Sequence, residues 1–440
     1  MTSLKTSDNF DSVSRDETEI IAELAGSARK WFVQDALPMW WNNGFDWQHG
    51  TWQESLDMHG VPTDQNRRAR VQGRQTYVFS QIENMEIVGP WNVLVHAGMK
   101  GIFQHYCDSS GLLQTVLSSK AQPVDQRKKL YDQTFAILAL ASARREVDEA
   151  ENQALSLLIK IEDNFRKSGV RGFVENCDKH PFQSNAHMHL LEAAMAWAEG
   201  CKEDGVSGLV WENLANEIVD LALDRFIDHD GGFLREFFNE DWQPKEGRDG
   251  TVVEPGHQFE WAWLLARWAR FAGRPECLEA AKRLFRSGTA GVHELHGAAV
   301  NTLDDKLRQV TGDARLWPQT EWLKAALVLF EMSPGAMRPY YLNAVKAAWT
   351  ALARYLDTGK PGLWFDNLRA DGQFEKNLSP ASSFYHIAVA VTQLCETSER
   401  TCDALVKSSA APNVIRFPMK KVASQGQSSG ANSNHFGSFH

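Results

Sequence analysis

Three histidines in this 440-residue sequence occupy positions that suit proton transfer. His189 lies four residues after Asn185, His257 lies three residues before Glu260, and His386 lies in the apolar stretch SSFYHIAVAV. Residues three or four apart share one face of a helix, so each pair would point to the same side. A carboxylate beside an imidazole fixes the tautomer of the ring and raises its pKa, which suits a proton carrier. The first expectation is therefore acid–base chemistry carried out by histidines.

A short glycine-led segment recurs six times along the chain. Its copies begin at Gly50, Gly111, Gly172, Gly232, Gly297 and Gly362, at intervals of 61, 61, 60, 65 and 65 residues. Each copy starts with apolar or aromatic residues and usually continues with polar ones, which predicts a small strand followed by a turn. Such near-constant spacing is typical of an architecture built from repeats.

The segments between these copies have apolar residues at i, i+3, i+4 and i+7, the period of an amphipathic helix. We expect about twelve helices, at residues 18–36, 64–83, 89–106, 124–144, 147–168, 183–200, 208–227, 256–272, 275–288, 313–333, 336–357 and 379–396. Each glycine segment falls between an odd-numbered helix and the following even-numbered one, so the unit is a helical hairpin with a long β-like loop.

One helical hairpin cannot bury its own apolar face, so the repeated hairpins must stack, and a closed ring of six removes the exposed ends. The expected fold is all-α: an (α/α)6 barrel of six helical hairpins with short β-like loops at one mouth. The barrel would span residues 18–405, between flexible segments at 1–17 and 406–440. An open helical solenoid remains an alternative, because the number of helices does not demonstrate closure.

The reactive side chains recur at one height in these repeats. Arg74, His189, His257, Glu321 and His386 follow their glycines by 24, 17, 25, 24 and 24 residues. All of them would lie in or near the first turns of even-numbered helices. If those helices form the inner ring, their matching ends converge on one mouth, and five repeats contribute to one site.

Two of the sixteen tryptophans are candidates for the wall of this site. Trp317 and Trp364 lie beside the polar cluster or at the end of a repeat. The flat face of an indole suits the apolar face of a sugar ring.

Composition and motifs exclude several other classes of function. The net charge of −10 argues against a nucleic acid as the main partner. The acidic N-terminal residues and the lack of any apolar run of about 18 residues predict a cytoplasmic protein without membrane spans. The six cysteines form no C-x-x-C pair, His187 must point away from His189, and no glycine-rich phosphate-binding motif occurs. We expect no metal and no nucleotide cofactor, and a monomer or homodimer.

Five segments occur in an order that resembles a known superfamily: RVQGRQTYVF, NAHMHLLEA, EPGHQFEWAWLL, WPQTEW and PASSFYHIAVA. Over roughly Thr18 to Leu405, the sequence is similar to the N-acylglucosamine 2-epimerase superfamily of (α/α)6 sugar isomerases and epimerases. It looks closest to the branch that holds D-mannose isomerases and sulfoquinovose isomerase. The disaccharide 2-epimerases usually have aromatic residues where this chain has Leu316 and Ala381, which disfavours a cellobiose-type substrate.

This resemblance implies roles for individual residues. His257 and His386 would be the general acid/base pair, and His189 would assist ring opening or orientation. Arg74 would hold the sugar oxygens and stabilise an enediolate. The groups that would bind the substrate or support the others are Asn185, Glu260 and Glu321.

The residue types fit that chemistry. A proton next to a sugar aldehyde is weakly acidic, so its removal needs a base and a cation at the oxygen that gains charge. Returning the proton to C1 gives a ketose, and returning it to C2 from the other face gives the epimer. The expected function is an aldose–ketose isomerase of D-mannose, or a close analogue, and D-fructose. A monosaccharide 2-epimerase, an inverting glycoside hydrolase using Glu260 and Glu321, and an inactive carbohydrate-binding barrel are the alternatives.

Overall fold

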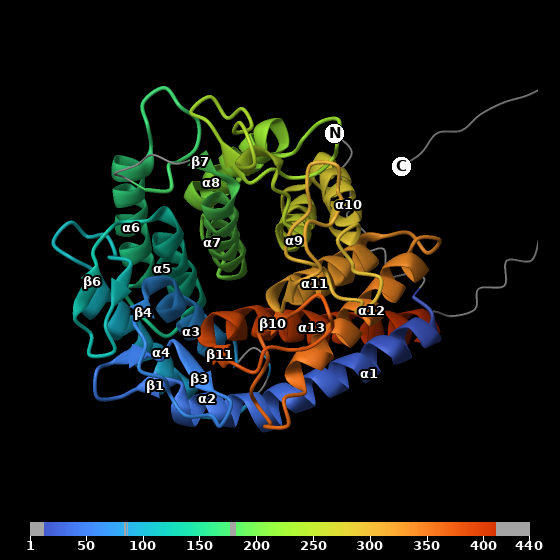
Figure 1. Ribbon diagram of the computed structural model, residues 1–440, viewed down its shortest axis with the longest axis horizontal. Coiled ribbons are helices and arrows are strands. Elements are labelled where there is room, and N and C mark those ends of the chain that lie inside the picture. The colour runs from blue at the N-terminus through green and yellow to red at the C-terminus, as the bar shows by residue number, and fades with distance from the viewer. Residues whose placement is uncertain (1–12, 83–84, 86, 177–181, 411–440) are drawn as a thin grey trace, which may run out of the picture.

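The computed structural model describes residues 13–82, 85, 87–176 and 182–410. Within these residues, long helices alternate between an outer and an inner ring (Figure 1). The outer ring consists of α1 (Arg15–Trp31), α4 (Trp91–Gly101), α6 (Ala150–Phe165), α8 (Leu209–Leu221), α10 (Pro275–Thr289) and α12 (Arg338–Leu356). The inner ring consists of α3 (Ala69–Gln81), α5 (Leu130–Ser142), α7 (Ser184–Glu203), α9 (Pro255–Ala272), α11 (Trp317–Met332) and α13 (Ala381–Ala410).

The ring is closed. Each inner helix contacts the next one, and the last, α13, contacts the first, α3. The loops close in the same way, because strand β11 (Leu378–Pro380) of the sixth repeat pairs antiparallel with β3 (Ser55–Asp57) of the first, with Ser379 opposite Leu56. The predicted (α/α)6 barrel is therefore confirmed, and the open solenoid is wrong.

Burial patterns explain why each helix takes its place. The outer helix α10 buries one stripe, which includes Cys277, Ala281 and Leu284, as expected of an amphipathic helix. The inner helix α11 is buried on every side from Pro318 to Glu331. Polar side chains on an inner helix must therefore either find partners inside the barrel or face its cavity.

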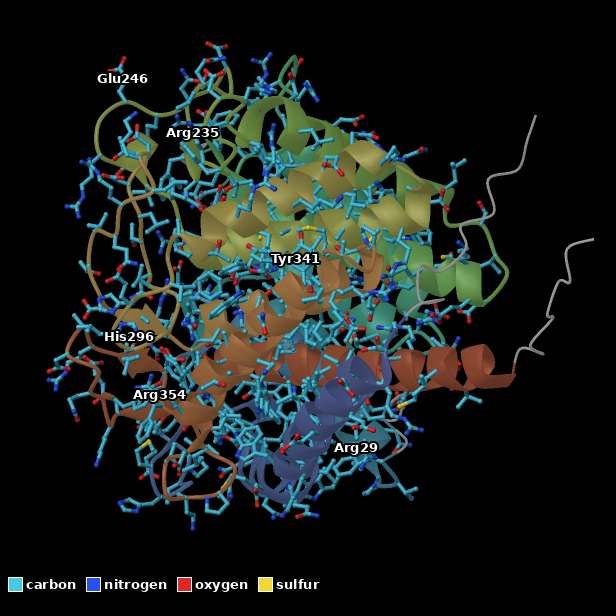
Figure 2. The ribbon with its side chains drawn as sticks, turned by 90° about the vertical axis from the view of Figure 1, so that its right-hand side faces the viewer. Arg29, Arg235, Glu246, His296, Tyr341 and Arg354 are labelled. Atoms are coloured by element: carbon cyan, nitrogen blue, oxygen red, sulfur yellow. The ribbon has the colours of Figure 1, made fainter. Side chains whose placement is uncertain are left out.

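The outer face of the ring is visible in Figure 2, where Arg29 marks α1 and Tyr341 and Arg354 mark α12. Arg354 donates a hydrogen bond to the backbone carbonyl of His296, at 2.6 Å. This bond ties the outer helix of the last hairpin to the loop of the hairpin before it.

Short elements complete each hairpin. They include α2 (Leu37–Asn43), a 3-10 turn η5 (Asp249–Thr251), and single π turns η1 (Phe32–Ala36), η3 (Ile102–Tyr106) and η4 (Ala222–Phe226). The remaining strands are β1 (Phe45–Asp46), β2 (Thr51–Trp52), β4 (Arg67–Arg68), β5 (Val116–Leu117), β6 (Pro123–Asp125), β7 (Phe182–Gln183), β8 (Phe237–Phe238), β9 (Ala314–Arg315) and β10 (Asn367–Leu368). Strands β4, β7 and β9, each just before an inner helix, pair with strands from the following repeat's loop. The loops therefore interlock around the mouth.

The sixfold glycine rhythm has a structural cause. All six repeat glycines have positive φ, between 66° and 83°, a conformation that glycine adopts at little cost. Just after each glycine, the backbone of the loop is held by a side chain from the start of the next inner helix. For example, the amide of Gln133 accepts a hydrogen bond from the backbone N–H of Leu113 and donates one to its carbonyl. The helix side chains in the equivalent places are Gln72, His187, Gln258 and Gln319, and in the sixth repeat Ser379 of strand β11, just before α13, takes this role.

The ends of the chain differ in part from the sequence prediction. Helix α1 begins at Arg15 because Ser14 and Glu17 form a reciprocal capping box. Helix α13 continues to Ala410. Segments 1–17 and 406–440 were expected to be flexible, but residues 15–17 and 406–410 are helical. Residues 13 and 14 precede the first helix, and the remaining residues of both segments lie outside the described part. None of the helices described combines the length and apolar character that crossing a bilayer requires.

Candidate active site

The inner helices all present their N-terminal turns to the same end of the barrel, where they surround a cavity of about 510 Å³. Seven of the nine residues predicted from sequence line this cavity, and they come from α3, α7, α9, α11 and α13. They are Arg74, Asn185, His189, His257, Glu260, Trp317 and His386. A cavity of this size accommodates a monosaccharide.

Each of the three histidines in the cavity has a carboxylate at its Nδ1 atom. His257 Nδ1 lies 2.9 Å from Glu236 Oε2, and His386 Nδ1 lies 2.8 Å from Glu321 Oε1. An ionised carboxylate only accepts hydrogen bonds, so each Nδ1 atom carries the hydrogen. The Nε2 atom is then the nitrogen left to take up or release a proton.

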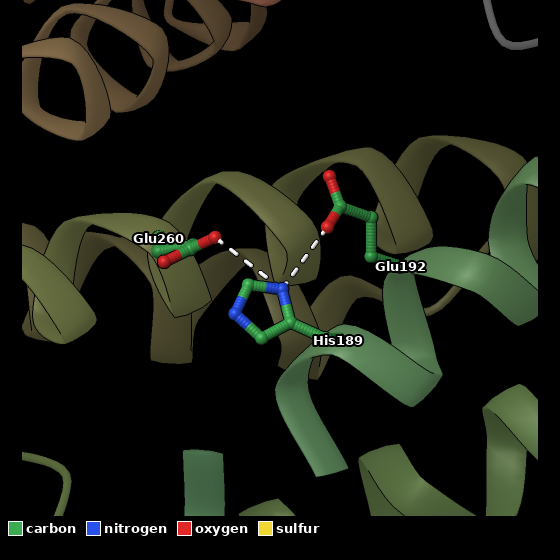
Figure 3. A group of neighbouring side chains, drawn as sticks. All are labelled: His189, Glu192 and Glu260. Carbon is green, nitrogen blue, oxygen red and sulfur yellow. Dashed lines mark hydrogen bonds and ion pairs between the residues drawn. The ribbon is translucent and has the colours of Figure 1, made fainter. Parts of the chain in front are cut away.

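His189 follows the same pattern, as Figure 3 shows. Its Nδ1 atom lies 3.2 Å from Glu192 Oε2 and 3.8 Å from Glu260 Oε1. The hydroxyl of Tyr385 donates a hydrogen bond to the other oxygen of Glu192. Burial, with the nearby charge of Glu321, raises the pKa of Glu260 well above its usual value.

The environments of His257 and His386 push their pKa values in opposite directions. Burial lowers the pKa of His257, but the carboxylates of Glu236 and Glu254 outweigh it and raise the pKa to about 10. Burial, together with the positive charges of Arg74 and others, lowers the pKa of His386 well below 6.5. Near neutral pH, His257 is therefore an imidazolium and His386 a neutral imidazole. Such a split separates the acid from the base in an active site.

Trp317 lies close to both of these histidines. The centre of its ring is 5.2 Å from that of His257 and 5.8 Å from that of His386. The indole therefore offers a flat surface in the cavity beside both the acid and the base.

Arg74 is a buried cation without a counter-ion. Among the residues described, no carboxylate oxygen lies within 4.0 Å of its guanidinium group, which instead donates to the hydroxyl of Tyr131 at 3.0 Å and lies 4.3 Å from the ring centre of Phe135. Its Nε atom is buried and has no hydrogen-bond partner. A buried charge is costly without a partner, so this guanidinium is suited to hold an anionic oxygen in the cavity.

Two predicted site residues lie elsewhere. Glu321 is fully buried behind His386 and does not line the cavity, and its second oxygen is 2.6 Å from the ammonium nitrogen of Lys324. Trp364 is also fully buried, and its ring stacks on Trp40 at 4.9 Å in the wall between hairpins. Trp364 is two residues after the repeat glycine Gly362, in the part of the loop whose backbone is held by Ser379, and not at the mouth of the barrel. Neither side chain lines the cavity. Glu321 instead supports His386, which is the second of the two roles expected of it, whereas Trp364 is core and does not form the expected wall of the site.

One predicted pairing also differs. The i, i+3 spacing suggested that Glu260 would support His257, but Glu236 does so. Glu260 lies beside His189 of the neighbouring helix instead. A shared helical face brings two side chains to one side of a helix, and it does not decide which of them meet.

Four residues of the site were not found by sequence reasoning. Glu192 is three residues after His189 and Lys324 is three after Glu321, so helical spacing could have indicated both. Glu254, three residues before His257, was likewise accessible. Glu236 comes from the fourth glycine segment, and no local pattern connects it with an imidazole.

Two overlapping groups have ligand atoms close enough to hold a metal ion. They are His189, Glu192 and Glu260, and Glu260, Glu321 and His386, with the atoms of each group within 4.8 Å of one another. In the second group, the ammonium of Lys324 already neutralises Glu321. In the first, His189 and Tyr385 donate hydrogen bonds to Glu192. An ion pair and hydrogen bonds within the protein thus account for these contacts, and a metal-free site stays a prediction.

Comparisons with known proteins agree with this geometry. The chain is 39% identical over 381 residues to a protein of Rhizobium meliloti (strain 1021) named mannose-6-phosphate isomerase, covering 86% of this chain and 98% of the relative. The crystal structure of a D-mannose isomerase superposes with a TM-score of 0.75 at 19% identity, covering 88% and 100% of the two chains. The cellobiose 2-epimerase of Bacillus thermoamylovorans B4167 has a TM-score of 0.76 at 19% identity, covering 85% and 99%. The sequence profile of the N-acylglucosamine 2-epimerase family matches residues 50–390, and the chain therefore belongs to that family.

Proposed function

We propose that this protein is an aldose–ketose isomerase that interconverts D-mannose, or a close analogue, and D-fructose through an enediolate. The observation that carries the proposal is a neutral and a charged imidazole, His386 and His257, that both lie beside Trp317 in one cavity. The relative from Rhizobium meliloti, named mannose-6-phosphate isomerase, supports the type of reaction.

The proton transfers balance with these groups. In the open-chain aldose, Nε2 of His386 removes the proton from C2, and His257 protonates the oxygen on C1. Arg74 holds the negative charge that develops on the sugar oxygens. The O2 proton then returns to His257 while His386 delivers its proton to C1. The product is the ketose, and both histidines regain their starting states.

The 2-epimerase alternative follows the same steps as far as the enediolate. It differs in one step, because a group on the other face must protonate C2. His257 and His386 both approach Trp317, so two proton donors are available around one substrate. The product therefore distinguishes the two reactions.

The glycoside hydrolase alternative is disfavoured by geometry. It needs two carboxyl groups that flank the scissile bond. Of the two candidates, Glu260 lines the cavity but Glu321 does not, because it lies behind His386.

Incubation with D-mannose in D2O tests the proposal. We expect fructose to accumulate, with deuterium at C1 to the extent that the imidazolium of His386 exchanges with solvent before it returns the proton. Product analysis by NMR measures both. Glucose with deuterium at C2 would instead indicate the 2-epimerase. A protein that binds sugars and turns over none would be a binding barrel, and the enzyme proposal would be wrong.

The pH dependence of kcat/KM should reflect the opposite states of the two histidines. His257 must be protonated, so activity should fall as the pH rises through about 10. His386 must be neutral, so activity should fall on the acidic side only well below pH 6.5. After subtraction of an enzyme-free blank, His257→Gln should leave a slow enzyme without the alkaline limb. An unchanged alkaline limb would show that another group is the acid.

A further inference from the structure

The wall of the cavity is rich in basic side chains. The chain has a net charge of −10, yet five of its basic side chains surround this one cavity. They are Arg68, Arg70, Arg74, Lys129 and Arg315. Burial raises the pKa of all four carboxyl groups in the lining, Glu175, Glu254, Glu260 and Asp366. Three of these cations already have a carboxylate within ion-pair distance: Arg68 has Glu54, Arg70 has Asp132 and Arg315 has Glu254. Within the described residues, Arg74 and Lys129 have no such partner, so an anionic substrate would supply the negative charge that these two lack.

Two of the cations lie close together above Arg74. Arg70 is four residues before Arg74 on α3, so its Cα lies about 6 Å nearer the mouth of the barrel. Lys129 immediately precedes α5, the neighbouring inner helix. Both side chains act electrostatically on Asp132 and Glu175, which places them at the same part of the wall.

Lys129 and Arg70 differ in how far they are already neutralised. Arg70 has a partner, because its guanidinium lies 3.2 Å from Asp132. In the described part of the chain, no carboxylate oxygen lies within 4.0 Å of the ammonium nitrogen of half-buried Lys129. Its neighbour Lys128, by contrast, pairs with Asp108 at 2.5 Å, and Lys128 does not line the cavity. Among the residues that the structure describes, Lys129 is thus a cation at the wall without a carboxylate partner.

Glu175 completes this part of the wall. Its Oε2 atom is buried and has no hydrogen-bond partner. Burial and the nearby charge of Asp132 raise the pKa of Glu175 to about 8, so near neutral pH the group is mostly a carboxylic acid. A protonated carboxyl group donates a hydrogen bond to an anion instead of repelling it.

We propose that Arg70, Lys129 and Glu175 form a subsite for an anionic group, a phosphate or a sulfonate, on the sugar carbon farthest from the carbonyl. The inference rests on the proposed function, since Arg74 and the two catalytic histidines fix where the carbonyl end lies. One helical turn separates Arg70 from Arg74, a distance comparable to the length of a hexose chain. A tetrahedral anion offers three acceptor oxygens, one for each of these donors.

Substrate comparison is the first test. We expect kcat/KM to be about 10- to 100-fold higher for mannose 6-phosphate, or for the 6-deoxy-6-sulfonate hexose, than for mannose, because hydrogen bonds to charged groups contribute to binding at this level. The two anionic sugars distinguish phosphate from sulfonate. Equal or better turnover of neutral mannose would overturn the subsite and leave the isomerase intact. Turnover of none of the three would overturn the proposed function instead.

The variant Lys129→Gln tests the residue assignment. It should lower the ratio of kcat/KM for the anionic sugar to that for mannose by about tenfold. Lys128→Gln removes the same charge one residue away, from outside the cavity, and should leave that ratio unchanged. A ratio in Lys129→Gln that equals the wild-type ratio would overturn the role of Lys129.

Binding of inorganic phosphate provides a measurement that does not depend on turnover. Calorimetry should show about tenfold weaker phosphate binding by Lys129→Gln than by the wild type and by Lys128→Gln. Equal affinity in all three proteins, or no binding by the wild type, would contradict the subsite even if no sugar is converted.

Discussion

Replacing His386 by asparagine should lower kcat by about 10²- to 10⁴-fold, the range expected when a positioned general base is lost. The amide nitrogen of asparagine stands roughly where Nδ1 of the imidazole was, so the hydrogen bond to Glu321 can persist. What disappears is Nε2, the atom that takes the proton from C2. His386→Asn therefore removes the proton-accepting atom and keeps the hydrogen bond to Glu321.

The measurement is the rate of ketose formation, together with the exchange of the C2 proton of mannose with solvent. Both should fall together in His386→Asn. In His257→Asn, ketose formation should fall while some exchange at C2 persists, because the base remains. Wild-type exchange in His386→Asn would contradict the assignment of the base and move it to His257 or His189.

The fold could be predicted from sequence because its signals are local and repeated. The 3.6-residue period marks both helices of each hairpin, and the glycines mark the positive-φ turns that begin the loops. The starts of some inner helices were less accurate. Helix α3 begins at Ala69 and not at residue 64, since Arg67 and Arg68 form a strand with the loop of the following repeat. That pairing joins residues about fifty positions apart, so the periodicity of apolar residues within one segment cannot predict it.

For the site as well, local and repeated features could be predicted from the sequence, and contacts between distant segments could not. Side chains on the inner helices could be placed at one mouth by their common offset from the repeat glycine. Which carboxylate meets which imidazole depends on how neighbouring helices are rotated about their axes. The sequence therefore identified His257 as a candidate, and only the structure connects it with Glu236 of a loop. Trp364 shows the converse error, because an aromatic residue near a repeat end can as well be core.

Arg74, which the sequence analysis placed at the mouth of the barrel, is expected to have the second large effect on the rate. Arg74→Met should lower kcat by about 10²- to 10³-fold, because it removes a preorganised charge from the oxygens that become negative in the enediolate. Methionine has a similar length and can fill the space beside Phe135, so packing should be largely kept. Arg74→Lys should recover part of the lost rate, since it restores the charge without the planar fork. Arg369→Met, at an exposed position outside the cavity, is the control for loss of one arginine.

The same variant has an independent signature in the pH profile. The positive charge of Arg74 contributes to the low pKa of His386. Its removal should therefore raise that pKa and shift the acidic limb of kcat/KM to higher pH, whereas loss of packing alone would leave the limb in place. A variant with higher KM but wild-type kcat would mean that Arg74 binds the substrate and the transition state equally. The negative charge of the enediolate would then have to be held by His257 alone.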